Sequence, residues 1–177
     1  MSLSTYVGQF SDGDASYIAA NGTKLEDKGM GFFGISCHNA TFIWLYRAKH
    51  GGSWPSLGDV AGAQGFIDGL IRFGHPTRVT AKNRPVEGDI LIFADPSSSQ
   101  VGQHSCVAVS GGSKIAGYNQ TGWFPGGLAH DYSLEDASDV DWIARSCGLL
   151  TPRRANVQGG EKYIWAVREG TALGRMG

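Results

Sequence analysis

The sequence lacks a long apolar run, and it carries little charge of either sign. A membrane-spanning helix needs about 20 predominantly apolar residues, and no stretch of the 177-residue chain approaches that length. Charged residues make up 18% of the chain, and the formal net charge is −1. Nothing in this composition draws the protein to a phosphate backbone or to an anionic lipid surface. We therefore expect neither a membrane-spanning protein nor a nucleic-acid binder.

Cysteine is scarce, and its arrangement excludes a disulfide framework. The three cysteines, Cys37, Cys106 and Cys147, are odd in number and widely spaced, and they form no Cys-X-X-Cys pair. Such pairs, together with closely spaced histidines, are typical of zinc sites. The five histidines show no His-X-X-X-His spacing. We therefore expect no metal and no cofactor, and three reduced thiols of which one is a candidate nucleophile.

The N-terminal segment lacks the features of a secretory signal. It has neither a basic leader nor an apolar core of the kind that such signals contain, so we expect synthesis in the cytoplasm. The early residues are polar and interrupted by Gly and Asp. They suit either a short strand and turn over Tyr6 to Phe10 or a poorly ordered arm over residues 1–28.

The remaining composition predicts one folded domain over residues 1–177. Hydrophobic residues make up 41% of the chain, which is enough for a core of domain size. Apolar residues at helical spacing predict a mostly buried helix from Cys37 to Lys49, ended by Gly51 and Gly52. A second apolar stripe predicts a helix from Gly58 or Asp59 to Phe73.

Short apolar runs bounded by turn residues follow the two predicted helices. The turn signals are the segment Arg84–Gly88 and the pair Gly111-Gly112, which predicts a hairpin. The predicted strands cover Asp89–Ala94, His104–Ser110, Ser113–Gln120 and Lys162–Arg168, and a polar tail is expected after the last. Helices followed by an antiparallel sheet define an α+β fold.

Three side chains in these elements have the chemistry of a nucleophilic cysteine site. Cys37 opens a helix, where free N–H groups and the helix dipole favour a thiolate. His104 heads a strand and supplies an imidazole that exchanges protons with the thiol. Asn119 lies late on the next strand, about as far from the Gly111-Gly112 turn as His104. Its amide oxygen would orient the imidazole as a cross-strand neighbour.

At these residues the chain resembles a known family. The segments ISCHNATFIWLYRAK and PVEGDILIFADPSSSQVGQHSCVAVSGGSKIAGYNQ are similar to NlpC-type and CHAP-type cell-wall cysteine hydrolases, which have a papain-like fold. Those proteins have a Cys that opens a buried helix, a Gly-Asp pair before an apolar strand, and a His at the head of the next strand. A third polar residue follows on the strand after that. The resemblance covers roughly Ile35 to Gln120.

The resemblance implies hydrolysis of an amide bond through an acyl-thioester. Cys37 is then the nucleophile, His104 moves the proton, and Asn119, or Gln120 beside it, orients His104. The implied oxyanion donor is the backbone N–H of Cys37. The implied substrate is peptide in bacterial peptidoglycan. Gln120 and the loop aromatic Trp123, which follows the matched segment, are candidate substrate-binding residues, with core packing as the alternative for Trp123. An immunity or inhibitor protein is an expected partner, and a specialised secretion system or cell lysis is the expected route out of the cell.

Two other interpretations remain open at this point. The first keeps the Cys37, His104 and Asn119 site but directs it at a protein, as a toxin-like cysteine protease or a deamidase. The second is a catalytically silent binding module of the same fold. We expect Cys106 and Cys147 to be structural, His38 to have a capping or surface role, and Asp89 to be a turn carboxylate.

Overall fold

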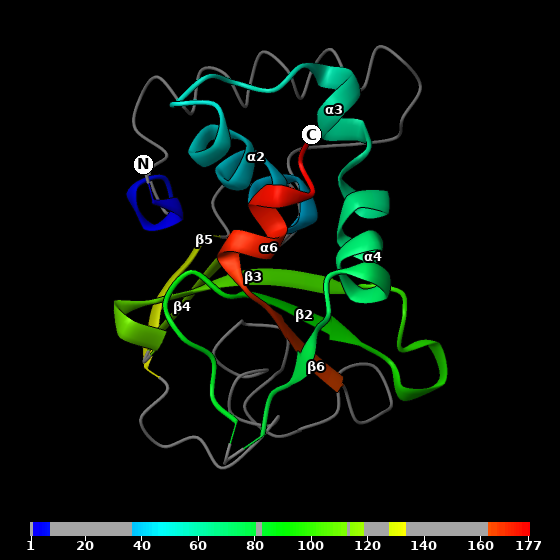
Figure 1. Cartoon of the computed structure of the whole chain (residues 1–177). Helices are drawn as coiled ribbons and strands as arrows, with labels where there is room; N and C mark the ends of the chain where they lie inside the picture. Colours follow the sequence, from blue (N-terminus) through cyan, green and yellow to red (C-terminus); the bar gives the residue numbers. More distant parts are fainter. Residues whose placement is uncertain (1, 8–36, 81–82, 113, 119–127, 134–162) are drawn as a thin grey trace.

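The computed structural model describes residues 2–7, 37–80, 83–112, 114–118, 128–133 and 163–177. In this part of the chain, helices cover one face of a six-stranded antiparallel sheet (Figure 1), with strand order β1-β6-β2-β3-β4-β5. The strands are β1 (Thr77–Arg78), β2 (Ile90–Ala94), β3 (His104–Val109), β4 (Lys114–Tyr118), β5 (Leu128–Ser133) and β6 (Tyr163–Val167). This arrangement confirms the predicted α+β class.

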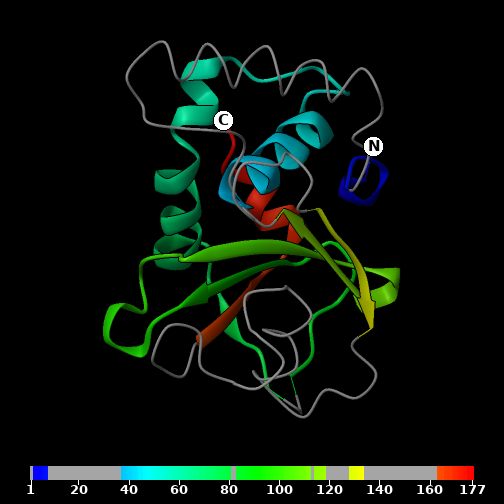
Figure 2. The same ribbon diagram turned by 180° about the vertical axis from the view of Figure 1, so that it is seen from behind.

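The helix that carries the candidate nucleophile has the predicted bounds. Helix α2 (Cys37–Lys49) packs on the sheet against β3 and β4 and contacts the other helices of that face. Its apolar residues are nearly all buried, from Ala40 to Leu45. It lies on the same face of the sheet as α4 and α6 in both views (Figure 1, Figure 2).

The second predicted helix is two helices in the structure. The prediction of one helix up to Phe73 was wrong at Gly62, which separates α3 (Leu57–Ala61) from α4 (Ala63–Phe73). A capping box begins α3: Ser56 Oγ accepts from the Asp59 N–H, and the Asp59 carboxylate accepts from the Ser56 N–H. The Gly62 N–H then closes α3 on the carbonyl of Asp59. A residue of low helix propensity at the junction explains the break.

The chain also ends differently from the prediction. A polar tail was expected after Arg168, but a short helix, α6 (Glu169–Gly174), follows β6 directly and buries Ala172. The carboxylate of Glu169 accepts a hydrogen bond of 2.8 Å from the Leu3 N–H. That bond holds the 3₁₀ turn η1 (Leu3–Thr5) at the start of the described chain against α6. Tyr6 and Val7 do not form the suggested strand, and residues 8–10 lie outside the described residues.

The main core lies between the helices and one face of the sheet. Strand side chains alternate between the two faces. Ile90, Ile92 and Val107 belong to the buried cluster that the helices share. Their alternates Leu91, Phe93 and Cys106 are also buried but lie outside that cluster. Alternation therefore places these residues, and His104 with them, on the opposite face of the sheet.

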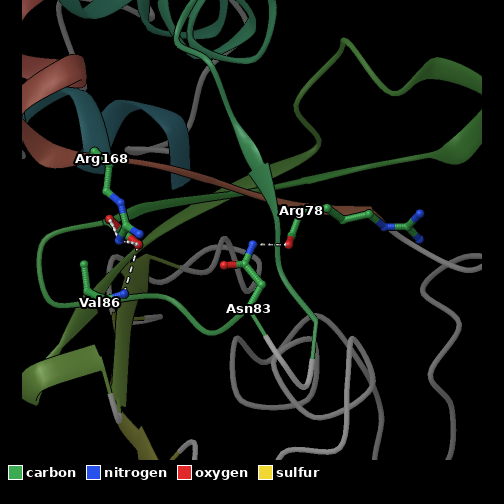
Figure 3. A network of polar contacts seen from close by, with 5 residues as sticks. Arg78, Asn83, Val86 and Arg168 are labelled. Atoms are coloured by element: carbon green, nitrogen blue, oxygen red, sulfur yellow. Dashed lines mark hydrogen bonds and ion pairs between the residues drawn. The ribbon is translucent and has the colours of Figure 1, made fainter.

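The turn before β2 is fixed by a buried carboxylate, as expected for Asp89. Asp89 is 1% exposed and accepts from the Val86 N–H at 2.9 Å and from the Arg168 guanidinium at 2.8 and 3.1 Å (Figure 3). The same view shows the Asn83 amide donating to the carbonyl of Arg78 at 2.7 Å. The Gly-Asp pair thus ties the turn to the end of β6.

The predicted hairpin joins β3 to β4. Val109 pairs with Lys114 at its closed end, and the intervening Gly111 and Gly112 have φ angles of 70° and 86°. This left-handed region is strained for residues with a side chain. At Gly112 there is also no space, because a Cβ would lie 2.4 Å from the carbonyl oxygen of Pro85.

Candidate functional site

The thiol of Cys37 lies where several backbone N–H groups converge. Cys37 is the first residue of α2, and hydrogen bonds from the backbone of Ser105, His38 and Cys37 itself each act to lower the pKa of the thiol. Burial opposes them and is the largest effect, and the charge of nearby Cys106 acts in the same direction as burial. The net result is a pKa above the ordinary value of a cysteine. The resting thiol is therefore protonated at neutral pH.

The backbone directions along β3 locate this thiol further. The Ala108 N–H donates to the carbonyl of Asp89, on the β2 side of β3. Successive N–H groups on a strand point to opposite sides, so the Ser105 N–H points to the β4 side. The described pairing of β3 with β4 starts at Val107, which leaves the Ser105 N–H available to the sulfur. Cys37 thus sits beside β3, one residue from the position of His104.

His104 begins β3, as predicted, and its imidazole is buried. It is 3% exposed and makes an edge-to-face contact with Phe93, its partner on β2, at 5.5 Å between ring centroids. Burial, and secondarily the nearby His38 ring, lowers the pKa of His104 to about 3. Its Nε2 is buried, and no hydrogen-bond partner for it lies among the residues that the structure describes. At neutral pH the ring is therefore neutral.

The side chain of His104 points to the sheet face opposite the one that Ser105 presents to α2. Ser105 directs its side chain at α2 through its hydrogen bonds to His38 and Thr41, so alternation turns His104 to the other sheet face. Among the described residues, the polar contacts of Cys37 are with β3 at Ser105 and Cys106 and with its own helix, and none joins it to His104. The pairing of the two groups stays a prediction.

The other predicted site residues lie outside the described part of the chain. Asn119, Gln120 and Trp123 all fall in the segment 119–127, and Cys147 falls in 134–162. Their predicted roles, in orienting His104 and in binding substrate, therefore stay predictions. Cys106 is buried on β3, which agrees with the packing role expected for it.

His38 is the residue that the sequence interpretation misjudged. A capping or surface role was expected, but His38 is buried between α2 and β3. Its Nδ1 lies 2.9 Å from Ser105 Oγ, and its Nε2 lies 3.0 Å from the carbonyl oxygen of Gly102. The only signal in the sequence was its place in the first turn of an almost wholly apolar helix. A polar side chain at such a position needs a buried partner.

Within the described ranges, no group of three or more His, Cys, Asp or Glu side chains is arranged to hold a metal ion. Likewise, the helices of the described chain are too short or too polar to cross a bilayer.

Comparisons with protein-family models, with curated proteins and with solved structures find no match to the chain. The geometry around Cys37 and β3 is therefore the basis for assigning a function.

Proposed function

We propose that the protein is a cysteine hydrolase of papain-like fold that cuts an amide bond, with Cys37 as nucleophile and His104 as general acid and base. One observation carries the proposal: the backbone of Ser105, His38 and Cys37 itself acts to lower the pKa of the Cys37 thiol at the start of a helix. Such donors stabilise a thiolate and the oxyanion of an acyl-transfer intermediate.

Both groups of the proposed pair are neutral in the free protein, so the sulfur has to be deprotonated as it reacts. The thiol has a raised pKa, and His104 has a pKa of about 3, so in the free protein the proton stays on sulfur. His104 Nε2 accepts this proton as the sulfur attacks the carbonyl carbon. The C–N bond then breaks, and the imidazolium returns the proton to the leaving amine. Water, deprotonated by His104, attacks the thioester, releases the carboxylic acid and regenerates the thiol.

Asn119 is proposed as the residue that orients His104 from its place in the sequence. The described pairing of β3 with β4 ends at Val107 and Ala116, and His104 and Asn119 each lie three residues beyond it along the chain. An amide oxygen opposite the ring would fix its tautomer, as the third residue of a catalytic triad does.

The proposed substrate is peptide of bacterial peptidoglycan, which the resemblance of the Cys37 and Gly88–Phe93 segments suggests. The test is digestion of purified peptidoglycan by the wild type, Cys37→Ala and the matched variant Cys106→Ala, with released fragments separated by chromatography and identified by mass. We expect fragments with new amino groups from the wild type and Cys106→Ala, and none from Cys37→Ala. Equal digests from all three proteins, or none from the wild type, would remove the assignment.

A specific observation also favours a second function, a silent binding module of the same fold. The His104 ring is fully buried on the sheet face opposite Ser105, and burial keeps the Cys37 thiol protonated. A binding module would sediment with purified peptidoglycan without releasing fragments from it. The hydrolase would release fragments in the same incubation, so one experiment separates the two functions.

A further inference from the structure

A buried chain of hydrogen bonds joins the first turn of α2 to β3. His38 and Thr41 on α2 and Ser105 on β3 are each almost completely buried. Ser105 Oγ lies 2.9 Å from His38 Nδ1, 3.0 Å from Thr41 Oγ1 and 3.4 Å from the carbonyl oxygen of Cys37. The Ser105 hydroxyl therefore contacts three residues near the start of α2.

The directions of these bonds follow from the donors and acceptors present. The carbonyl of Gly102 can only accept, so His38 Nε2 carries a proton and donates to it. Burial, the largest effect, lowers the pKa of His38, although the backbone of Gly102 and the charge of Asp68 oppose it. The ring is therefore neutral, and its Nδ1 accepts the proton of Ser105 Oγ. The Ser105 hydroxyl also faces Thr41 Oγ1 and the carbonyl oxygen of Cys37 as acceptors, so its single proton is shared among three contacts.

The loop before β3 is held at the same point from a second helix. Gly102 donates its N–H to the carboxylate of Asp68 at 2.8 Å, and its carbonyl also accepts from the Gln64 amide at 2.9 Å. Both side chains belong to α4. A Cβ at Gly102 would lie 2.8 Å from Ile67 and 3.5 Å from the His38 ring. The carbonyl that His38 meets is therefore fixed in place.

We propose that His38 is a positioning residue that holds the Cys37 thiol against the backbone N–H of Ser105; the inference rests on the proposed role of Cys37 as nucleophile. His38 follows Cys37 directly, and its ring is bonded to Ser105 and to the loop that leads into β3. Rotation or sliding of the first turn of α2 would break both bonds at once. The thiol thereby keeps its place beside Ser105.

The test measures the chemistry of the thiol and needs no hydrolase activity. Alkylation of Cys37 by iodoacetamide is followed from pH 6 to pH 10, with the modified cysteine identified by peptide mass. The variants are Ser105→Ala, which removes the shared hydroxyl, His38→Leu, and His38→Gln, which keeps one donor and one acceptor. His50→Leu is the control, because His50 is exposed at the far end of α2. Circular dichroism checks that each variant is folded.

We expect the Cys37 pKa to fall toward its ordinary value in Ser105→Ala and His38→Leu, because a loosened helix start admits water. Alkylation near pH 8 should then be several-fold faster than in the wild type. His38→Gln and His50→Leu should keep the wild-type profile. If His38→Leu does not fold, Ser105→Ala, which loses a single atom, decides the matter. Wild-type profiles in every folded variant would overturn the positioning role, whether or not peptidoglycan is cut.

Discussion

Replacing His104 by Leu should remove an acid sensitivity of the fold. The His104 pKa is about 3 in the folded protein against an ordinary value of 6.5. Between these values the unfolded chain binds one more proton than the folded chain, so the free energy of unfolding falls as the pH drops. The loss in free energy of unfolding starts near pH 6.5 and grows by about 1.4 kcal/mol for each unit by which the pH falls. At pH 5 it amounts to about 2 kcal/mol relative to neutral pH.

The measurement is urea unfolding at pH 7.5 and pH 5.0, followed by tryptophan fluorescence. From the first pH to the second, the wild type should lose about 2 kcal/mol more than His104→Leu. The lowered pKa of His38 acts in the same direction, but His38 is present in both proteins. At pH 7.5 His104→Leu should be at least as stable as the wild type, because it removes a buried nitrogen that has no partner in the described part of the chain. It should also lose the proposed hydrolase activity.

His50→Leu is the control for the pH dependence, since it removes an exposed imidazole and should lose as much stability as the wild type. An equal loss in the wild type and His104→Leu would show that His104 titrates normally in the folded protein. The imidazole would then not sit in a desolvated site, and the inference from its burial to a lowered pKa would be refuted.

Two further predictions concern the turns on either side of β2 and β3. Asp89→Ala should lower the free energy of unfolding by about 1–3 kcal/mol, because the Val86 N–H and the guanidinium of Arg168 lose their acceptor. Arg168→Lys changes a side chain that is 55% exposed and should cost under about 1 kcal/mol. Urea unfolding measures both, and equal losses in the two variants would contradict the central role of the buried carboxylate. Gly111→Ala should lower the free energy of unfolding by about 1 kcal/mol, because its φ is positive. Gly112→Ala should lower it further, because the added Cβ also meets the backbone of Pro85. Equal melting temperatures of the two variants would refute the steric clash at Gly112.

Hydrophobic periodicity and glycine stops predicted helix α2 and strands β2, β3, β4 and β6, but not strands β1 and β5. The helix from Cys37 to Lys49 has its predicted bounds, because an apolar segment is followed at once by two glycines, both with positive φ. The strand over Ile90–Ala94 is an apolar run between Asp89 and Asp95. In each case a local stop signal coincides with the end of the apolar pattern, so neighbouring elements do not change the outcome.

Prediction failed where a short-range cap competes with a continuous apolar stripe. The stripe from Val60 to Ile71 indicates one helix, but the Ser56–Asp59 capping box and Gly62 divide it. After β6, the acidic and small residues from Glu169 onward lack a clear stripe. Their helix is held by contacts with distant parts of the chain, among them the bond from Leu3 to Glu169. Such contacts leave no local pattern in the sequence.

The inward position of His38 could not be deduced from the helix that contains it. Helix α2 is buried around most of its circumference, so no polar stripe indicates which side chains meet the sheet. The direction of His38 is set by how the helix is rotated over β3. That rotation is fixed by hydrogen bonds to Ser105 and Gly102, 67 and 64 residues away.

The same rotation determines which groups of β3 reach the nucleophile. A strand presents alternate side chains to a helix packed on it, so α2 can contact the side chain of Ser105 or that of His104, but not both directly. The helix contacts the side chain of Ser105, and the thiol of Cys37 lies against the backbone N–H of the same residue. The proposed hydrolase mechanism would therefore require His104 to reach the sulfur from the sheet face opposite α2, past Ser105. The described pairing of β3 with β4 begins at Val107, so the proposed activity would depend on the arrangement of the chain next to Ser105.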